Sequence, residues 1–237
     1  MIFRKIDDAY SAMRSRFISC FLMLLMLSAL PARSQDVDSL FALLDSTEIS
    51  ESQIELQLQY ARAVSNTDIR KALDYAHGAL NNAEEIRSTR WIAESKLAIG
   101  QFYDYLGVNR DASNLLMEAF SDFRVLGDSV KQATTLKSIG NSLFYLDQFE
   151  SALDYYTLVQ EYGRALNDTS LIISGINATA AVYGNTDKRD TALILLNEAL
   201  DLSRQIGSLE QEILAYYNIG DVHLYDERRT QALKVYH

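Results

Sequence analysis

The chain has 237 residues, of which 48% are hydrophobic and 23% are charged, so it is globular rather than disordered. Its formal net charge of -10 argues against a nucleic-acid partner, because proteins of that class carry basic surfaces. The single proline, Pro31, lies near the N-terminus, and the remaining chain is rich in Ala, Leu, Glu and Gln, which predicts an all-α protein.

Residues 1–34 are predicted to be a secretory signal peptide. Two arginines precede the uncharged run FISCFLMLLMLSAL, and the small residues Ala32 and Ser34 precede a cleavage site at Gln35. A membrane anchor is the alternative, although spanning a bilayer takes about 20 apolar residues. Cleavage would remove Cys20, the single cysteine, and with it any disulfide or thiolate chemistry. We therefore expect an exported chain located in the bacterial periplasm.

A repeat with a period of forty residues follows a lead-in helix that we expect over 35–52. Alanine returns at this step along the chain, and so does a small residue that is glycine at three of its four places. Because several kinds of residue recur with the same period, the chain contains copies of a single unit. The copies are 53–92, 93–132, 133–172, 173–212 and 213–237, the last of them incomplete.

Within each copy the apolar spacing is helical. In the third copy, Ile139, Gly140 and Leu143 share one helix face, and Ala152 with Tyr156 shares a second face after the break YLDQ. The unit is therefore helix, short turn, helix. Glycine costs about 1 kcal/mol relative to alanine inside a helix, so its return at one position predicts close helix packing. The residues expected to pack between helices are Gly100, Ala112, Ala119, Gly140, Ala152, Ala180, Ala192, Ala199, Gly220 and Ala232.

These positions resemble the tetratricopeptide repeat. The family has a small residue at position 8, a large one at 11, alanine at 20, a large apolar residue at 24 and alanine at 27. The resemblance covers about residues 53–237 and implies a right-handed superhelical solenoid of antiparallel helix pairs. Two departures are a period of forty rather than about thirty-four, and Tyr60 where a small residue belongs. The pattern is present as Gly100/Tyr103/Ala112/Leu116/Ala119 and Ala180/Tyr183/Ala192/Leu196/Ala199.

The long period is similar to that of the extracytoplasmic tetratricopeptide segments of bacterial sensor kinases, cyclases and transcription regulators. This likeness implies a periplasmic sensory module of a signal-transduction protein. The chain stops within the second helix expected for its last copy, so we expect a protein truncated at its C-terminus. Membrane attachment would then depend on a segment beyond residue 237. The alternative is a free-standing periplasmic scaffold for an envelope protein complex.

In this family the first helix of every pair lines a concave surface that binds partners. Aromatic rings supply contact area and amides hydrogen-bond a backbone, so an extended peptide or a protein is the expected ligand. The alternative is that Tyr105, Tyr145 and Tyr225 only pack at the ends of the first helices. The candidate groove residues are Asp104, Tyr105, Lys137, Asn141, Phe144, Tyr145, Asn177, Tyr217, Asp221 and Tyr225.

One ligand class of the family is not supported. Lys137 and Asn141 match the first pair of the clamp that holds a C-terminal carboxylate, but Ala178, Leu214 and Asn218 stand where its other members belong. The three histidines lack metal-ligand spacing, and the chain contains neither a phosphate loop nor a nucleophile elbow. We therefore expect no catalytic residue, no metal and no cofactor within this chain.

Overall fold

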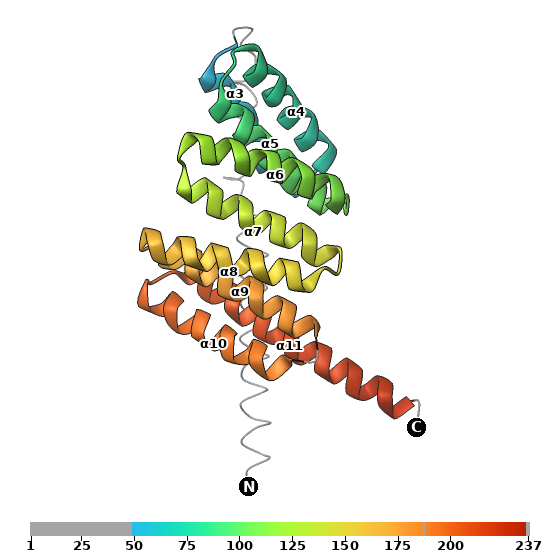
Figure 1. Ribbon diagram of the computed structural model, residues 1–237. Helices are drawn as coiled ribbons and strands as arrows, with labels where there is room; N and C mark the ends of the chain where they lie inside the picture. Colours follow the sequence, from blue (N-terminus) through green and yellow to red (C-terminus); the bar gives the residue numbers. More distant parts are fainter. Residues whose placement is uncertain (1–48, 187, 236–237) are drawn as a thin grey trace. The chain divides into compact units, whose positions relative to one another are not determined.

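The computed structural model describes the backbone of residues 49–186 and 188–235, with side chains as far as His223. The predicted signal peptide, residues 1–34, and most of the predicted lead-in helix lie outside the described residues. Over the described part the chain forms nine α-helices and no strand (Figure 1). The helices are α3 (Glu51–Val64), α4 (Ile69–Glu85), α5 (Thr89–Tyr105), α6 (Asn109–Leu126), α7 (Ser129–Tyr145), α8 (Phe149–Leu166), α9 (Thr169–Asn185), α10 (Arg189–Gln205) and α11 (Leu209–Val235).

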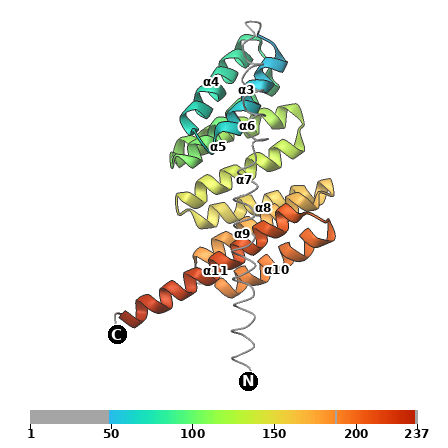
Figure 2. The ribbon, with the colours of Figure 1, turned by 180° about the vertical axis from the view of Figure 1, so that it is seen from behind.

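The helices stack in chain order as antiparallel pairs, as Figures 1 and 2 show from opposite sides. Each helix packs against the helices before and after it, from α3 to α11. Successive first helices, α3, α5, α7, α9 and α11, also contact one another directly, which second helices do not do to a comparable extent. We call this line of first helices the inner row. The predicted all-α solenoid of antiparallel helix pairs is confirmed.

The turns repeat with the same forty-residue step as the core. Each second helix from α4 to α10 is followed by a residue in the left-handed region, with φ between 53° and 71°, namely Arg87, Gly127, Asn167 and Gly207. Glycine and asparagine adopt this conformation at the lowest cost, which explains three of the four. Aspartates begin several helices, and Asp128 and Asp168 accept hydrogen bonds from the backbone N–H groups of Lys131 and Leu171. Turn chemistry therefore sets the helix ends, independently of the apolar pattern.

The fifth copy departs from the predicted helix, turn, helix unit. α11 continues without a break from Leu209 to Val235, although the pattern places a turn after Tyr225. The equivalent turns after α5 and α7 contain Gly107 and Asp147 at φ of 74° and 57°. Glu227 occupies that place in the fifth copy, within the run DERRTQALK of good helix formers. Without a residue suited to the left-handed conformation, the helix continues.

The recurring small residues lie where helices of one pair approach each other. A Cβ atom added to Gly100 would lie 2.6 Å from Leu116 Cγ, and one added to Gly140 would lie 2.5 Å from Tyr156 Cε1. Both distances are shorter than carbon atoms tolerate, so the first helix carries no side chain at the place where the second helix presents a large one. The alanines of the same series are fully buried at 0% exposure, namely Ala112, Ala119, Ala152, Ala180, Ala192 and Ala199.

Gly220 differs from the other members of its series. No atom lies within 4 Å of a Cβ added there, and the residue is half-exposed. The reason is the continuous α11, which does not turn back to place a second helix against this glycine. Ala232 lies in the same helix, beyond the described side chains.

Tyr60 reverses the size pattern in the first pair. Its ring is buried at the position of the glycines, 4.6 Å from the Tyr75 ring in an edge-on arrangement, with Lys71 Nζ 5.2 Å from its centroid. Ala76 occupies the α4 position equivalent to that of Leu116 and Tyr156, and it is fully buried. Large and small residues have thus exchanged helices, which conserves the volume between them.

Replacing Gly140 by alanine tests this packing. The added methyl group would collide with the buried Tyr156 ring, so Gly140→Ala should destabilise the fold by about 1–3 kcal/mol despite the better helix propensity of alanine. Gly78 is the matched control, because the nearest atom to its added Cβ is Gln57 Nε2 at 3.8 Å; Gly78→Ala should stabilise by about 1 kcal/mol. Urea unfolding measures both, and equal stability of the two variants would contradict the packing role.

Candidate functional site

The structure places the candidate groove residues on α5, α7, α9 and α11, the neighbouring helices of the inner row. Three tyrosines among them are largely exposed, Tyr105 at 73%, Tyr145 at 61% and Tyr217 at 64%. Asp221 is also exposed, whereas Asp104, Lys137, Asn141 and Phe144 are half-buried and Asn177 is buried. Tyr225 lies beyond the described side chains. The row therefore combines accessible rings with polar groups held partly below the surface.

An ion-pair cluster joins three first helices at one end of the row. The buried Glu94 carboxylate of α5 lies 3.2 Å from Arg62 Nη2 of α3 and 2.6 Å from Lys131 Nζ of α7. A buried carboxylate is stable only when its charge is matched, and here two cations from the neighbouring helices match it. Glu94 is therefore occupied in holding the row together and is not available to a ligand.

Two further hydrogen bonds cross from α5 to α7. Gln101 Nε2 donates to Ser138 Oγ at 3.1 Å, and Ser142 Oγ donates to Asp104 Oδ1 at 2.7 Å. Burial raises the pKa of Asp104 to about 6, and the hydrogen bond from Ser142 opposes that rise without cancelling it. Asp104 thus changes its charge within the physiological range of pH, while it bridges two repeats.

Asn141 is oriented by the second helix of its own pair. Tyr156 of α8 donates its hydroxyl hydrogen to Asn141 Oδ1 at 2.9 Å. Burial, with smaller contributions from Tyr145 and Asp104, raises the pKa of Tyr156, so its hydroxyl remains a donor at neutral pH. With the oxygen engaged, the Asn141 NH₂ group is the part of this side chain that remains for a carbonyl acceptor.

Lys137 and Asn177 occupy the same repeat position on α7 and α9, forty residues apart. Burial lowers the pKa of Lys137, and no carboxylate among the described residues pairs with it. Asn177 is 4% exposed, and neither its Oδ1 nor its Nδ2 has a hydrogen-bond partner among the described groups.

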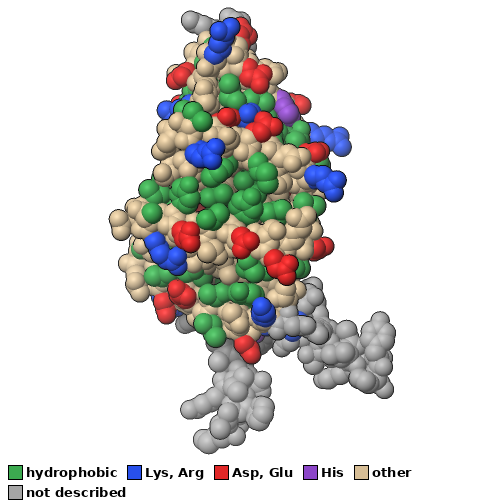
Figure 3. Space-filling model, in the orientation of Figure 1, with side chains coloured by type: hydrophobic (Ala, Val, Ile, Leu, Met, Phe, Trp, Pro, Cys, Tyr) green, Lys and Arg blue, Asp and Glu red, His purple; other side chains and the backbone are tan. Residues whose placement is uncertain are grey.

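Aromatic side chains gather at the turn between α7 and α8. The Phe144 ring centroid lies 5.5 Å from that of Tyr145 and 5.6 Å from that of Phe149. Tyr145 therefore packs at the helix end, as one interpretation of the sequence holds, and also exposes most of its side chain to a partner. Figure 3 shows hydrophobic side chains gathered over the middle of the array, where α6 and α7 lie.

The described residues include no group of three or more His, Cys, Asp or Glu side chains that could hold a metal ion. None of the described helices combines the length and the apolarity that crossing a bilayer requires. His77 Nε2 lies 3.5 Å from the Tyr103 hydroxyl on the neighbouring helix, an exposed contact without a third partner in the described chain.

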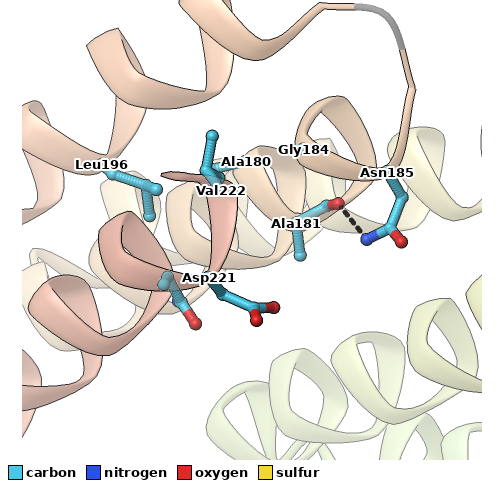
Figure 4. Close-up of a pocket in the computed structure, with 8 residues that line it drawn as sticks. Ala180, Ala181, Gly184, Asn185, Leu196, Asp221 and Val222 are labelled. Carbon is cyan, nitrogen blue, oxygen red and sulfur yellow. Dashed lines mark hydrogen bonds between the residues drawn. The ribbon is translucent and has the colours of Figure 1, made fainter. Parts of the chain in front are cut away.

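Sequence analysis missed a small cavity between α9, α10 and α11 (Figure 4). Ala181 and Gly184 line it at repeat positions where α5 has Gln101 and Asp104 and α7 has Asn141 and Phe144. This loss of side-chain size in the fourth copy is visible in the sequence. The size of the resulting cavity depends on the position of α11, which only the structure provides.

Replacing Asp104 by asparagine tests the charge of this group. Because its folded-state pKa lies above the ordinary 3.8, the folded chain holds the proton more tightly, and the contribution of Asp104 to stability is lost as pH rises from about 3.8 to about 6. Asp104→Asn should thus match the wild type near pH 3.5 and exceed its stability near pH 7.5 by about 1 kcal/mol, since solvent screens a half-buried group. Urea unfolding at both pH values measures this difference.

Asp154→Asn, at an exposed position of α8, is the control and should alter stability equally at both pH values. If the stability of Asp104→Asn relative to the wild type did not change with pH, the claim that burial raises the pKa of Asp104 would be contradicted.

Solved structures of known proteins share this architecture. A Rap protein complexed with competence and sporulation factor is 14% identical, with a TM-score of 0.62 over 77% of this chain and 56% of its own. Aspartyl phosphate phosphatase F from Bacillus subtilis is 17% identical, with a TM-score of 0.63 over 79% of this chain and 49% of its own. A signal transduction ATPase with numerous domains and a tetratricopeptide repeat sensor, from Pyrococcus horikoshii, is 15% identical, with a TM-score of 0.66 over 80% of this chain and 30% of its own.

The chain thus spans about half the length of the first two structures and less than a third of the ATPase. The sequence matches no protein-family model and no curated protein. Identities this low establish the fold alone. Together with the helix pairs described above, they show that this chain is a tetratricopeptide-like helical solenoid.

Proposed function

We propose that this chain is a non-catalytic module that binds a protein or an extended peptide along its inner row. The observation that supports this most strongly is the combination of Tyr145 on α7 and Tyr217 on α11, both exposed, with an Asn141 amide held in a fixed orientation. Exposed tyrosines supply large contact areas at low entropic cost, and oriented amides bond a peptide backbone without regard to its sequence.

The inner row is held rigid before any ligand arrives. The Glu94 cluster and the hydrogen bond from Ser142 to Asp104 connect α3, α5 and α7 through side chains as well as through packing. A surface that is already ordered loses little conformational entropy on binding, so more of the contact energy remains as affinity. These connections lie in the N-terminal half, while the C-terminal half contains the buried Asn177, whose amide has no hydrogen-bond partner among the described groups.

We further propose that the module is the periplasmic sensory part of a bacterial signal-transduction protein. Residues 1–34 support export, because they combine a basic start, an apolar run and small residues before Gln35. One structure with this fold is a sensor within a signal transduction ATPase, and another was solved in complex with a competence and sporulation factor. Attachment to a membrane and to an output domain would depend on sequence beyond residue 237.

A free-standing periplasmic scaffold for an envelope protein complex is the second candidate. The fold supports it equally, because stacked helix pairs offer a large surface without any output domain. Reading the gene past codon 237 separates the two proposals. An apolar span of about 20 residues followed by a signalling domain would support the sensor, and a stop codon after one more helix would support the scaffold.

Site-specific crosslinking in the native host tests the binding face. A photoreactive phenylalanine at position 145 or 217 should form adducts with a partner, because both side chains are exposed on the inner row. The controls are positions 125 and 194, on the second helices α6 and α10, where Val125 is 79% exposed and Ile194 is 69% exposed. Adducts are read on denaturing gels, and equal adducts from both pairs of positions would refute the assignment of the inner row.

A reporter fusion tests export separately. Residues 1–34 joined to an alkaline phosphatase without its own signal should give an active enzyme, because that reporter folds only after its disulfides form outside the cytoplasm. Leu24→Arg, which interrupts the apolar run, should abolish that activity at unchanged expression. An inactive wild-type fusion would remove the periplasmic location and leave the binding proposal intact.

A further inference from the structure

The cavity between α9, α10 and α11 has a volume of about 60 Å³. A single water molecule needs about 10–15 Å³ on this scale, so the space is several times larger than one water requires. Figure 4 shows Leu196 of α10 and Asn185 of α9 at opposite ends of it, with Asp221 of α11 between them. The cavity is open to the inner row, because Asn185 and Asp221 are both exposed.

The cavity exists because the fourth pair lacks large side chains at two positions of the inner row. Ala181 replaces Gln101 and Asn141 of the earlier pairs, and Gly184 replaces Asp104 and Phe144. Val222 of α11 approaches this gap, with its Cγ2 atom 3.1 Å from a Cβ added to Gly184, but it does not fill it. The inner row thus has a recess at the place where α9 carries short side chains.

The lining changes from apolar to polar across the cavity. Ala180, Leu196 and Val222 are buried and form the apolar part. Asn185 and Asn218 contribute amides, and Asn185 donates through Nδ2 to the Ala181 carbonyl at 2.9 Å, which leaves its Oδ1 as an acceptor. A ligand group that fits must therefore combine an aliphatic stem with a donor at its end.

The charge of the lining selects among such groups. Among the described residues that line the cavity, Asp221 is the one that carries a charge, and α9 contains no charged residue along its whole length. A cation entering from the row would therefore meet a carboxylate without competition from a lysine or arginine of the lining. The side chains of lysine and arginine bury their methylene stems in apolar surroundings while the charged end binds oxygen acceptors.

From this geometry we infer that the cavity is a specificity pocket for a basic side chain, lysine or arginine, of the bound peptide. The stem lies against Leu196 and Val222, and the cationic end reaches the Asp221 carboxylate with the Asn185 Oδ1 atom as a second acceptor. This inference rests on the proposed function, since it names the side chain that the inner row prefers. An uncharged side chain of the same length would leave the carboxylate unpaired, and an acidic one would be repelled by it.

The first experiment uses small probes, so that it does not depend on knowing the peptide. N-acetyl-lysine methylamide and N-acetyl-arginine methylamide are titrated into the full chain, with N-acetyl-norleucine methylamide as the uncharged match for the lysine stem. Backbone amide resonances of α9 and α11 report binding. The basic probes should shift residues around Ala181 and Asp221 and should bind about threefold to fivefold more tightly than norleucine, as expected for one partly exposed ion pair.

Two variants assign the effect to the cavity. Asp221→Asn removes the charge without changing the shape, and should bring the basic probes to the affinity of the norleucine probe. Ala181→Gln restores the residue found at this position of α5, and should block all three probes. Glu198→Gln, on an exposed part of α10 outside the lining, is the control and should leave every affinity unchanged. Thermal unfolding confirms that each variant is folded before it is titrated.

A library of random heptapeptides then separates this inference from the proposed function. Peptides selected by the wild type should carry lysine or arginine at one position, and selection with Asp221→Asn should lose that preference alone. Selected peptides without a basic preference, or with one that survives Asp221→Asn, would overturn the pocket while the peptide-binding proposal stands. Equal binding of the basic and norleucine probes to the wild type would overturn the pocket whatever the library yields.

Discussion

The architecture depends on one steric exchange, in which a first helix gives up a side chain so that its second helix can insert a large one. Gly100 beneath Leu116 and Gly140 beneath Tyr156 bring the two helix axes closer than any side chain at these positions would allow. The first pair solves the same problem in reverse, with Tyr60 on α3 and Ala76 on α4. The spacing between the two helices is thus conserved, although the identity of the large residue is not.

Stacking the pairs has a second consequence, because it places the first helices side by side and forces their polar groups together. The Glu94 carboxylate is stable in this buried environment because Arg62 and Lys131 reach it from the two neighbouring helices. Asp104 instead accepts a hydrogen bond from the Ser142 hydroxyl, and burial raises its pKa to about 6. The N-terminal half of the inner row is therefore cross-connected, and the fourth pair, with its small side chains, is the more open part.

This asymmetry is relevant to binding. A surface that is rigid in one half and recessed in the other can hold a peptide backbone along its length while it selects one side chain. The oriented Asn141 amide and the exposed Tyr145 ring belong to the rigid half, whereas the cavity at Ala181 and Gly184 belongs to the open half. In the function proposed above, general affinity and specificity would thereby belong to different repeats.

The sequence by itself determined the helix pairs, because a forty-residue step in Ala112, Ala152 and Ala192 is a local pattern that survives without knowledge of the neighbours. The resemblance to the tetratricopeptide repeat also predicted that the first helix of each pair lines the binding surface. It did not determine the uninterrupted α11, whose turn position carries Glu227 in place of Gly107 or Asp147, since helix propensity in DERRTQALK outweighs the repeat pattern. Only the tertiary structure decided that Glu94 is matched by two cations, that Asn177 is buried without a hydrogen-bond partner among the described groups, and that a recess opens beside Asp221. Each of these depends on distances between side chains of different repeats, which the spacing along one chain does not specify.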